Sequence, residues 1–275
     1  MIDRIIVCLD GSLFAEQILP YARGIVGATG AALTLLRVLE VERQFAAAER
    51  YVQGLARHLG VEGKLKRGFE NVPAAVLEEL RERPAALPAI TTHGRGGLLQ
   101  AAIGSVALSV IRGADRPVFL YRPRAPASAG VADKTLTIST VVAPLDGSDY
   151  SAKILPFAGE IAKLLKTRLQ LVQVLPEEGS QPQIPRELKR DILESSYLRN
   201  VAEESRKKYG IEVDWEVLHG APAESLCSYV EGRQDLLLAM TSHARGGLER
   251  AIFGSVAGEC VRRAGVLMMV YWPSA

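Results

Sequence analysis

The sequence predicts an α/β protein of two repeated domains, each an open, twisted parallel sheet of five strands with helices on both faces. Short apolar segments alternate with amphipathic helical segments, which is typical of parallel strands joined by right-handed helical crossovers. Residues 5–40 are identical to residues 141–176 at 13 of 36 positions. Residues 91–123 are identical to residues 241–273 at 15 of 33 positions. Agreement in two separate regions indicates a tandem duplication.

Length and composition favour a globular protein of two domains. The chain has 275 residues, of which 48% are hydrophobic, so each half can bury its own core. A net charge of +2 provides no strong field, and we expect neither nucleic acid nor a membrane as a partner. A strand-like run begins directly after Met1, and no apolar run is long enough to span a bilayer. A cytoplasmic location is therefore expected.

The three cysteines do not form a recognised cysteine motif. Cys8, Cys227 and Cys260 contain no C-x-x-C pair, and three cysteines cannot all be paired within one chain. This count argues against a disulfide scaffold or a zinc site and favours a reducing compartment.

The first strand and helix are expected at residues 5–26. Ile5–Leu9 is a continuous apolar run that ends at Asp10-Gly11-Ser12, as a buried parallel strand followed by a turn and a helix cap would. The helix is predicted from about Ser12 to Val26. Pro20 lies inside this helix and is expected to kink it, because proline removes one hydrogen bond.

The rest of the first half continues the alternation. Residues 85–90 are predicted to form the fourth strand, and Pro88 predicts a bulge or a shortened strand because it has no N–H to donate. The other predicted elements are strands at 33–39, 64–69 and 117–121 and helices at 40–58, 72–83 and 105–113.

A segment rich in proline and small residues separates the two halves and is predicted to be a linker. The second half restarts the pattern at Val141 and carries a longer connection at 176–185, before a long helix that ends at about Lys208. The predicted boundaries are 1–124 for the first domain, 125–137 for the linker and 138–275 for the second domain.

A glycine-rich loop follows the fourth strand in each copy, from Thr91 to Ser105 and from Thr241 to Ser255. Its glycines permit close approach of a ligand to main-chain N–H groups. Gly104 and Ser105 then stand at a helix start, where unpaired N–H groups and the helix dipole favour an anion such as phosphate. The alternative is that Ser105 and Ser255 cap their helices without any ligand. Neither G-x-x-x-x-G-K-[ST] nor G-x-G-x-x-G is present.

Three segments converge if the first strand lies between the second and the fourth. Asp10 ends the first strand, Val38 lies at the end of the second, and Thr91 begins the loop after the fourth. Ligands of open parallel sheets bind at the carboxyl ends of the strands. Asp10 would then hold a ribose hydroxyl, the main chain at Val38 would face a base, and the loop would hold phosphates. The alternative for Asp10 is that it caps only local N–H groups.

Both halves resemble the universal stress protein family along their whole length. The family's nucleotide-binding loop is G-x2-G-x9-G-[S/T], and the first half has Thr91-x2-Gly94-x9-Gly104-Ser105 after the strand motif V-x-L-D-G-S. The second half has Thr241-x2-Ala244-x9-Gly254-Ser255. The resemblance implies the strand order 3-2-1-4-5 in each domain. It also implies a crevice that binds ATP or a related adenine nucleotide, possibly with Mg²⁺.

The resemblance also implies roles for individual residues. Asp10 and Asp146 match the acidic residue near the ribose, and Val38 and Val174 match the main-chain contact to adenine. The implied phosphate-loop residues are Gly94, Gly104, Ser105 and Val106 in the first half and Gly254, Ser255 and Val256 in the second.

Three departures from the family motif affect the expected affinities. Thr91 and Thr241 replace the first glycine and add a side chain close to the nucleotide. Ala244 replaces the second glycine, which costs on the order of 1 kcal/mol if that position needs a positive φ. We therefore expect the first half to bind nucleotide more readily than the second. A fourth strand distorted at Pro88 would instead weaken nucleotide binding by the first half.

The loop histidines and arginines suggest contacts rather than catalysis. His93 and His243 have no matched carboxylate or cysteine partner in the sequence, so loop packing or main-chain contact is expected for both. Arg95 and its counterpart Arg245 would reach a terminal phosphate or remain solvated. No catalytic residue is predicted.

The leading functional hypothesis is a nucleotide-binding stress-response protein that acts as a sensor or adaptor. One alternative is a slow ATPase or nucleotidyl-transfer enzyme that uses Asp10 or Asp146 near Mg²⁺. Another is an interaction module that has lost nucleotide binding. The apolar fifth strands, at 118–121 and 266–272, are predicted to pair with each other within one chain, and two chains are expected to associate as a homodimer.

Overall fold

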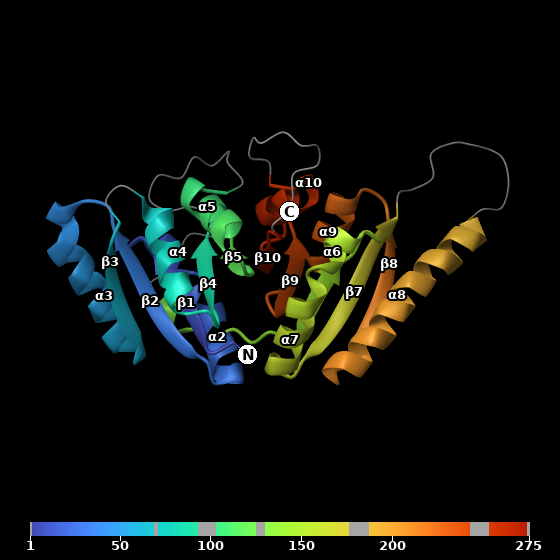
Figure 1. The fold of residues 1–275 in the computed structure, drawn as a ribbon, viewed down its shortest axis with the longest axis horizontal. Coiled ribbons are helices and arrows are strands. Elements are labelled where there is room, and N and C mark those ends of the chain that lie inside the picture. The colour runs from blue at the N-terminus through green and yellow to red at the C-terminus, as the bar shows by residue number, and fades with distance from the viewer. Residues whose placement is uncertain are drawn as a thin grey trace.

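The computed structural model describes residues 2–68, 71–92, 103–124, 130–175, 187–242 and 253–273. Its strands form one sheet of ten, in the order β3-β2-β1-β4-β5-β10-β9-β6-β7-β8 (Figure 1). Their bounds are β1 Arg4–Leu9, β2 Ala32–Leu39, β3 Glu62–Arg67, β4 Ala86–Thr91, β5 Val118–Tyr121, β6 Thr140–Pro144, β7 Arg168–Leu175, β8 Val213–His219, β9 Leu236–Thr241 and β10 Leu267–Tyr271. Each half therefore has the order 3-2-1-4-5, which confirms the predicted α/β fold.

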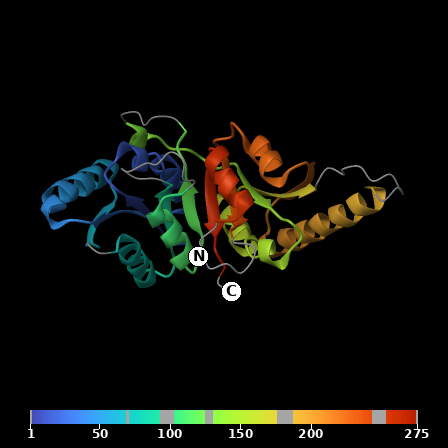
Figure 2. The same cartoon turned by 90° about the horizontal axis from the view of Figure 1, so that it is seen from above.

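The two halves meet at β5 and β10 in the middle of the sheet (Figures 1 and 2). These strands pair antiparallel, with Met269 opposite Phe119 and Met268 opposite Leu120. The other strand pairs in the sheet are parallel. Strands β3 and β8 are consequently the outer edges.

Helices cover both faces of the sheet and bury two separate cores. One core contains Ile25, Val52 and Ile161 from α2, α3 and α7, and the other contains Val76, Ile111 and Val261 from α4, α5 and α10. The helix bounds are α1 Leu13–Glu16, α2 Leu19–Thr29, α3 Phe45–Leu59, α4 Val72–Glu82, α5 Ser105–Gly113, α6 Asp149–Ala152, α7 Leu155–Leu165, α8 Glu187–Tyr209, α9 Pro222–Val230 and α10 Ser255–Arg263, with 3₁₀ turns η1 Glu42–Gln44 and η2 Val131–Asp133.

The expected kinked helix at residues 12–26 is two helices instead. The short helix α1 ends at Glu16, and α2 starts at Leu19, with Pro20 in its first turn. Proline is tolerated there because the N–H groups of a first turn have no partner inside the helix. The prediction that Pro20 kinks a continuous helix was wrong. The second half repeats this break between α6 and α7.

Pro88 does not distort β4. The strand has six residues, and its parallel register with β1 continues through Pro88, which lies opposite Ile6. The ladder with β5 begins one residue later, at Ala89. The predicted bulge or shortening was therefore wrong, and a distorted fourth strand no longer counts against the first half as a ligand site.

The helix predicted at 40–58 also begins later than expected. Residues 42–44 form the 3₁₀ turn η1, and the α-helix α3 starts at Phe45. The connection at 176–185 lies outside the described residues, and the long helix after it, α8, ends at Tyr209.

Candidate functional site

Equivalent residues gather at the carboxyl ends of the strands in each half. Strand β1 lies between β2 and β4, so the residues that follow these strands share one edge of the sheet with the start of α5. Strand β6 lies in the same way between β7 and β9, next to α10. Site 1 is defined by Asp10, Val38, Thr91, Gly104, Ser105 and Val106, and site 2 by Asp146, Val174, Thr241, Gly254, Ser255 and Val256.

The helix α5 starts without a side-chain cap. Its N-cap residue is Gly104, in an extended conformation with no side-chain hydrogen bond to the first turn. The N–H of Gly104 donates to the carbonyl oxygen of Thr92 at 2.5 Å. Ser105 is exposed and is already the first helical residue, so it is not the cap. Gly104 has no side-chain oxygen to offer the first-turn N–H groups, an arrangement that favours an anion.

The start of α10 repeats this arrangement. Gly254 is the N-cap without a side-chain cap, and its N–H donates to Oγ of the buried Ser242 at 3.2 Å. Ser255 is exposed and Val256 is half-buried, like Ser105 and Val106. The alternative in which Ser105 and Ser255 cap their helices is wrong for both halves.

Asp10 and Asp146 each close a tight turn. Oδ1 of Asp10 accepts hydrogen bonds from the N–H of Ser12 at 2.9 Å and from its hydroxyl at 2.6 Å. Oδ1 of Asp146 accepts the matching bonds from Ser148 at 3.0 and 2.5 Å. The glycine between each pair of residues has a φ of +83° or +82°, a conformation that glycine adopts without strain. Local capping by the Asp10 carboxylate, the alternative raised by the sequence, is thus present.

The Asp146 carboxylate is held in its charged form. Burial raises its pKa, but hydrogen bonds from Ser148 and Ser151 and from main-chain N–H groups outweigh burial, so the pKa of Asp146 lies below its usual range. Site 2 therefore carries this negative charge at neutral pH.

A buried polar group that the sequence analysis missed lies beside Asp10. The Arg37 guanidinium is buried at the end of β2 and donates to the carbonyl oxygen of Leu9 at 3.4 Å. Glu16 accepts a hydrogen bond from the Tyr51 hydroxyl at 2.9 Å. Burial, followed by the charges of Glu16 and Asp10, raises the pKa of Tyr51, although Arg37 acts in the opposite direction. The sequence did contain a signal for this buried group, because Arg37 lies inside the apolar run LTLLRVL at residues 33–39.

The corresponding part of site 2 is less charged. Gln173 stands at the position of Arg37 and Ala152 at that of Glu16, at the same spacing of 136 residues. Gln173 is also buried, and its amide lies near the turn at Gly147. Tyr197 of α8 is close enough to Asp146 for that charge, after burial, to raise the pKa of the tyrosine.

Val38 is fixed by close packing. A Cβ atom at Gly68 would lie 2.5 Å from Cγ1 of Val38, so only glycine permits this approach of the chain after β3. The N–H of Gly68 donates to the carbonyl oxygen of Leu39 at 3.0 Å. Val38 is buried and Val174 is half-buried, so the main chain rather than the side chain is the part of Val38 available to a ligand.

Two apolar side chains are exposed where β1 and β2 end. Leu13 is 52% exposed and Val41 is 40% exposed, and they follow neighbouring strands of site 1. The residue at the position of Leu13 in the second half is Asp149, which is also exposed. Site 1 thus has an apolar side chain at the position where site 2 has the Asp149 carboxylate.

The motif threonines differ in exposure. Thr91 is buried at the end of β4, while Thr241 is half-buried at the end of β9. The remaining predicted loop residues lie outside the described residues: His93, Gly94, Arg95, His243, Ala244 and Arg245.

Among the residues that the structure describes, no group of three or more histidine, cysteine, aspartate or glutamate side chains could hold a metal ion. No helix there is long and apolar enough to cross a membrane.

Sequence comparisons match both halves to one family. The model of the Universal stress protein family matches residues 1–122 and 137–271. A universal stress protein of Methanocaldococcus jannaschii is 32% identical over 133 residues, which cover 45% of this chain and 76% of that protein. A universal stress protein of Synechocystis sp. is 24% identical over 306 residues, covering 98% of this chain and 99% of that protein.

Solved structures share the fold over the full length. A universal stress protein from Archaeoglobus fulgidus superimposes with a TM-score of 0.69 at 16% identity and covers 100% of both chains. A protein of unknown function from Pseudomonas aeruginosa gives a TM-score of 0.65 at 18% identity, covering 99% of this chain and 93% of that one.

Proposed function

Because the chain belongs to the universal stress protein family, we propose that it binds ATP or a related adenine nucleotide at site 1 and site 2 and acts as a stress-response sensor or adaptor. The observation that carries this proposal is the pair of helix starts at Gly104 and Gly254, each without a side-chain cap and each at the same edge of the sheet as an aspartate turn.

The proposed binding mode assigns each part of the nucleotide to one part of the site. The N–H groups of Ser105 and Val106 solvate the phosphates, and the dipole of α5 contributes about 0.3–1 kcal/mol. A ribose hydroxyl donates to the Asp10 carboxylate. The adenine lies against the main chain at Val38 and the exposed side chain of Leu13, which lose contact with water.

Magnesium enters this proposal only with the nucleotide. Among the described residues there is no carboxylate cluster of the size a dedicated metal site needs. Mg²⁺ commonly binds through substrate phosphates and retained waters rather than through an all-protein cage. The ion would therefore arrive coordinated by the phosphates and neutralise part of their charge.

We further propose that site 1 binds more tightly than site 2. Leu13 offers an apolar contact where site 2 has Asp149, whose negative charge repels phosphate. The buried Arg37 cation is replaced by the neutral Gln173 and the Glu16 carboxylate by Ala152, so these two changes together leave the net charge the same and do not affect the ranking. Ala244 adds a methyl group at the position of the second motif glycine, which supports the same ranking.

A charge substitution at the helix starts tests the proposal in the full-length protein. Ser105→Glu and Ser255→Glu place a carboxylate where each phosphate is expected, while glutamate in a first turn is favourable for the helix. We expect each variant to lose one ATP site in a calorimetric titration and to keep its melting temperature. The site that remains in Ser255→Glu should bind more tightly than the one that remains in Ser105→Glu.

The matched control is Ser109→Glu, which adds the same charge one turn further along α5. Ser109 is exposed, and α10 already has Glu259 at the equivalent position, so the control is expected to fold and to bind ATP normally. Wild-type affinity in both Ser105→Glu and Ser255→Glu would show that the nucleotide does not bind at these helix starts. A wild-type protein that binds no adenine nucleotide would instead favour the interaction module.

A further inference from the structure

Two cysteines of the second half lie side by side between helices. Cys227 is on α9 and Cys260 is on α10, and both are buried, with 5% and 0% of their surface exposed. The two helices pack against each other, and each thiol is close enough to the other to shift its pKa. The Cys227 thiol also lies 3.9 Å from the carbonyl oxygen of Glu259, the residue before Cys260.

The surroundings make the two thiols chemically different. The hydrogen bond from Cys260 lowers the pKa of Cys227 to about 7, against the effect of burial, and Arg263 and Arg124 add to the lowering while Glu259 opposes it. The same contact and burial raise the pKa of Cys260. Cys227 is therefore the more readily ionised of the two thiols, and the thiolate is the nucleophilic form.

The cations near Cys227 come from both halves of the molecule. Arg263 lies on α10 and pairs with Glu259 at 3.5 Å. Arg124, which follows β5 of the first half, pairs with Glu231 at 3.6 Å and packs against Gly265. This environment depends on the docked arrangement of the two halves.

The pair is not needed to build the fold. The residues 150 positions earlier are Leu77 on α4 and Val110 on α5, so the first half packs the corresponding helices without sulfur. The third cysteine, Cys8, has its pKa raised to about 12 by burial and by the charge of Glu79, so it stays a thiol. Cys8 therefore provides an internal control for reactivity.

We propose that Cys227 and Cys260 form a reversible disulfide that ties α9 to α10. With a peroxide as the oxidant, the Cys227 thiolate attacks hydrogen peroxide, its O–O bond breaks, and Cys227 sulfenic acid and hydroxide form. The Cys260 sulfur then attacks the sulfenic sulfur, the S–O bond breaks, and water leaves. That water carries the Cys260 proton, and the hydroxide of the first step takes up the proton that Cys227 released on ionisation, so two thiols and one peroxide give one disulfide and two waters.

The geometry supports this bond without a large movement. A disulfide needs two sulfurs about 2 Å apart on segments that already approach closely, and the Cys227 sulfur already lies 3.9 Å from the carbonyl oxygen of the residue before Cys260. Helix α10 begins at Ser255, only five residues before Cys260, so the bond would fix the helix that starts site 2. The disulfide chemistry does not require that site 2 binds nucleotide.

Mass spectrometry of the full-length native protein tests the proposal. The protein is treated with hydrogen peroxide, blocked with N-ethylmaleimide after denaturation, and weighed intact. We expect two of the three thiols to escape labelling. A sample without N-ethylmaleimide should be lighter by two hydrogen atoms than the reduced protein, and digestion should release a Cys227–Cys260 cross-linked peptide. Dithiothreitol should restore three labelled thiols, and Cys8→Ser should still form the cross-link.

The variants Cys227→Ala and Cys260→Ala should each lose the cross-link. Because either variant could be poorly folded, the wild-type peptide map decides the question independently. Oxidation of Cys227 to sulfinic acid without a cross-link, a disulfide between two chains, or three labelled thiols after treatment would each overturn the proposal.

Discussion

Gly24 lies where residues 132–136 cross α2. A Cβ atom there would be 1.8 Å from the carbonyl oxygen of Leu136, and the N–H of Leu136 donates to the carbonyl oxygen of Pro20 at 2.9 Å. The Arg23 guanidinium donates to the carbonyl oxygens of Ala132 and Asp133 in the same segment. This segment is thus packed onto α2 by main-chain contacts that leave no room for a side chain at Gly24.

We predict that Gly24→Ala destabilises the protein by about 1–3 kcal/mol, because the methyl group must displace backbone rather than a flexible side chain. Urea denaturation measures the change. Gly27→Ala in the same helix is the matched control, since no atom lies within 4 Å of a Cβ there. It should stabilise by about 0.5–1 kcal/mol, as alanine favours helices. Equal effects of the two changes would refute the packing role of Gly24.

Single residues also show where sequence reasoning succeeded. Asp10, Val38 and Gly104 could be assigned to one end of the sheet from their places at strand ends and at a helix start. Arg37 and Gln173 could not be assigned to the site from the sequence. Successive side chains of a strand point to opposite faces of the sheet, but this alternation does not tell which polar side chain is buried. The sequence allows Ser105 to be the N-cap of α5, but in the structure Gly104 occupies that position.

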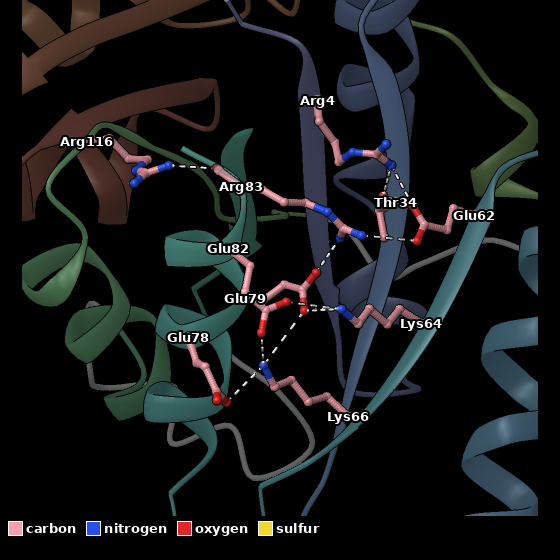
Figure 3. A network of polar contacts seen from close by, with 10 residues as sticks. All are labelled: Arg4, Thr34, Glu62, Lys64, Lys66, Glu78, Glu79, Glu82, Arg83 and Arg116. Atoms are coloured by element: carbon pink, nitrogen blue, oxygen red, sulfur yellow. Dashed lines mark hydrogen bonds and ion pairs between the residues drawn. The ribbon is translucent and has the colours of Figure 1, made fainter. Parts of the chain in front are cut away.

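At the scale of elements, the edge strand β3 is joined to α4 by a charged network (Figure 3). Glu79 is completely buried, and its carboxylate lies 2.5 Å from the Lys64 ammonium and contacts Arg83. Lys66 reaches Glu78 at 2.9 Å. Side chains of both signs cover this edge strand, a common protection of an edge against pairing with other chains.

We predict that Glu79→Gln destabilises the protein by about 3–5 kcal/mol, because it leaves partly buried cations without their central carboxylate. Glu82→Gln is the control, since Glu82 is exposed and lies 3.7 Å from Lys64 and Lys66. Loss of this exposed pair should cost about 1 kcal/mol or less. Thermal denaturation compares the two variants, and a larger effect of Glu82→Gln would contradict the central role of Glu79.

The errors at this scale concern prolines and boundaries. Pro20 was expected inside a helix because the apolar pattern continues through it, whereas the chain instead starts a new helix there. Pro88 was expected to disturb β4. Whether its missing N–H has this effect depends on which neighbouring strand is paired with β4 at that residue. Periodicity predicts that an element exists and does not specify its hydrogen-bond partners.

For the whole molecule, the joint between the halves is a pair of buried strands. Met268 of β10 is 2% exposed and lies opposite Leu120 of β5, in a core that extends across both halves. This pairing occupies the fifth strand of each half. An association of two chains, which stays a prediction, would therefore need a different surface.

We predict that Met268→Lys weakens the docking of the two halves by several kcal/mol, because it buries an unpaired ammonium group in the central sheet. Urea denaturation followed by circular dichroism measures the loss, and a broadened or two-step transition would be expected if the halves separate before they unfold. An unchanged midpoint and slope would contradict a central role for the β5–β10 pair.

The duplication and the alternation of strands and helices were sufficient to predict two sheets, and the family resemblance supplied their strand order. The fifth strands are predicted to pair within one chain, and β5 and β10 do pair in the structure, which joins the two sheets into one of ten strands. The antiparallel direction of this pair depends on how two separately folded halves meet. The loop residues His93, Gly94, Arg95 and His243 remain predictions.

The most direct test of the central claim is a crystal structure of the full-length protein grown with ATP and Mg²⁺. We expect phosphate oxygens within hydrogen-bond distance of the N–H groups of Ser105 and Val106, and the ribose beside Asp10. Site 1 should be filled at least as fully as site 2. Nucleotide bound elsewhere, or both sites without nucleotide at saturating ATP, would contradict the proposed function.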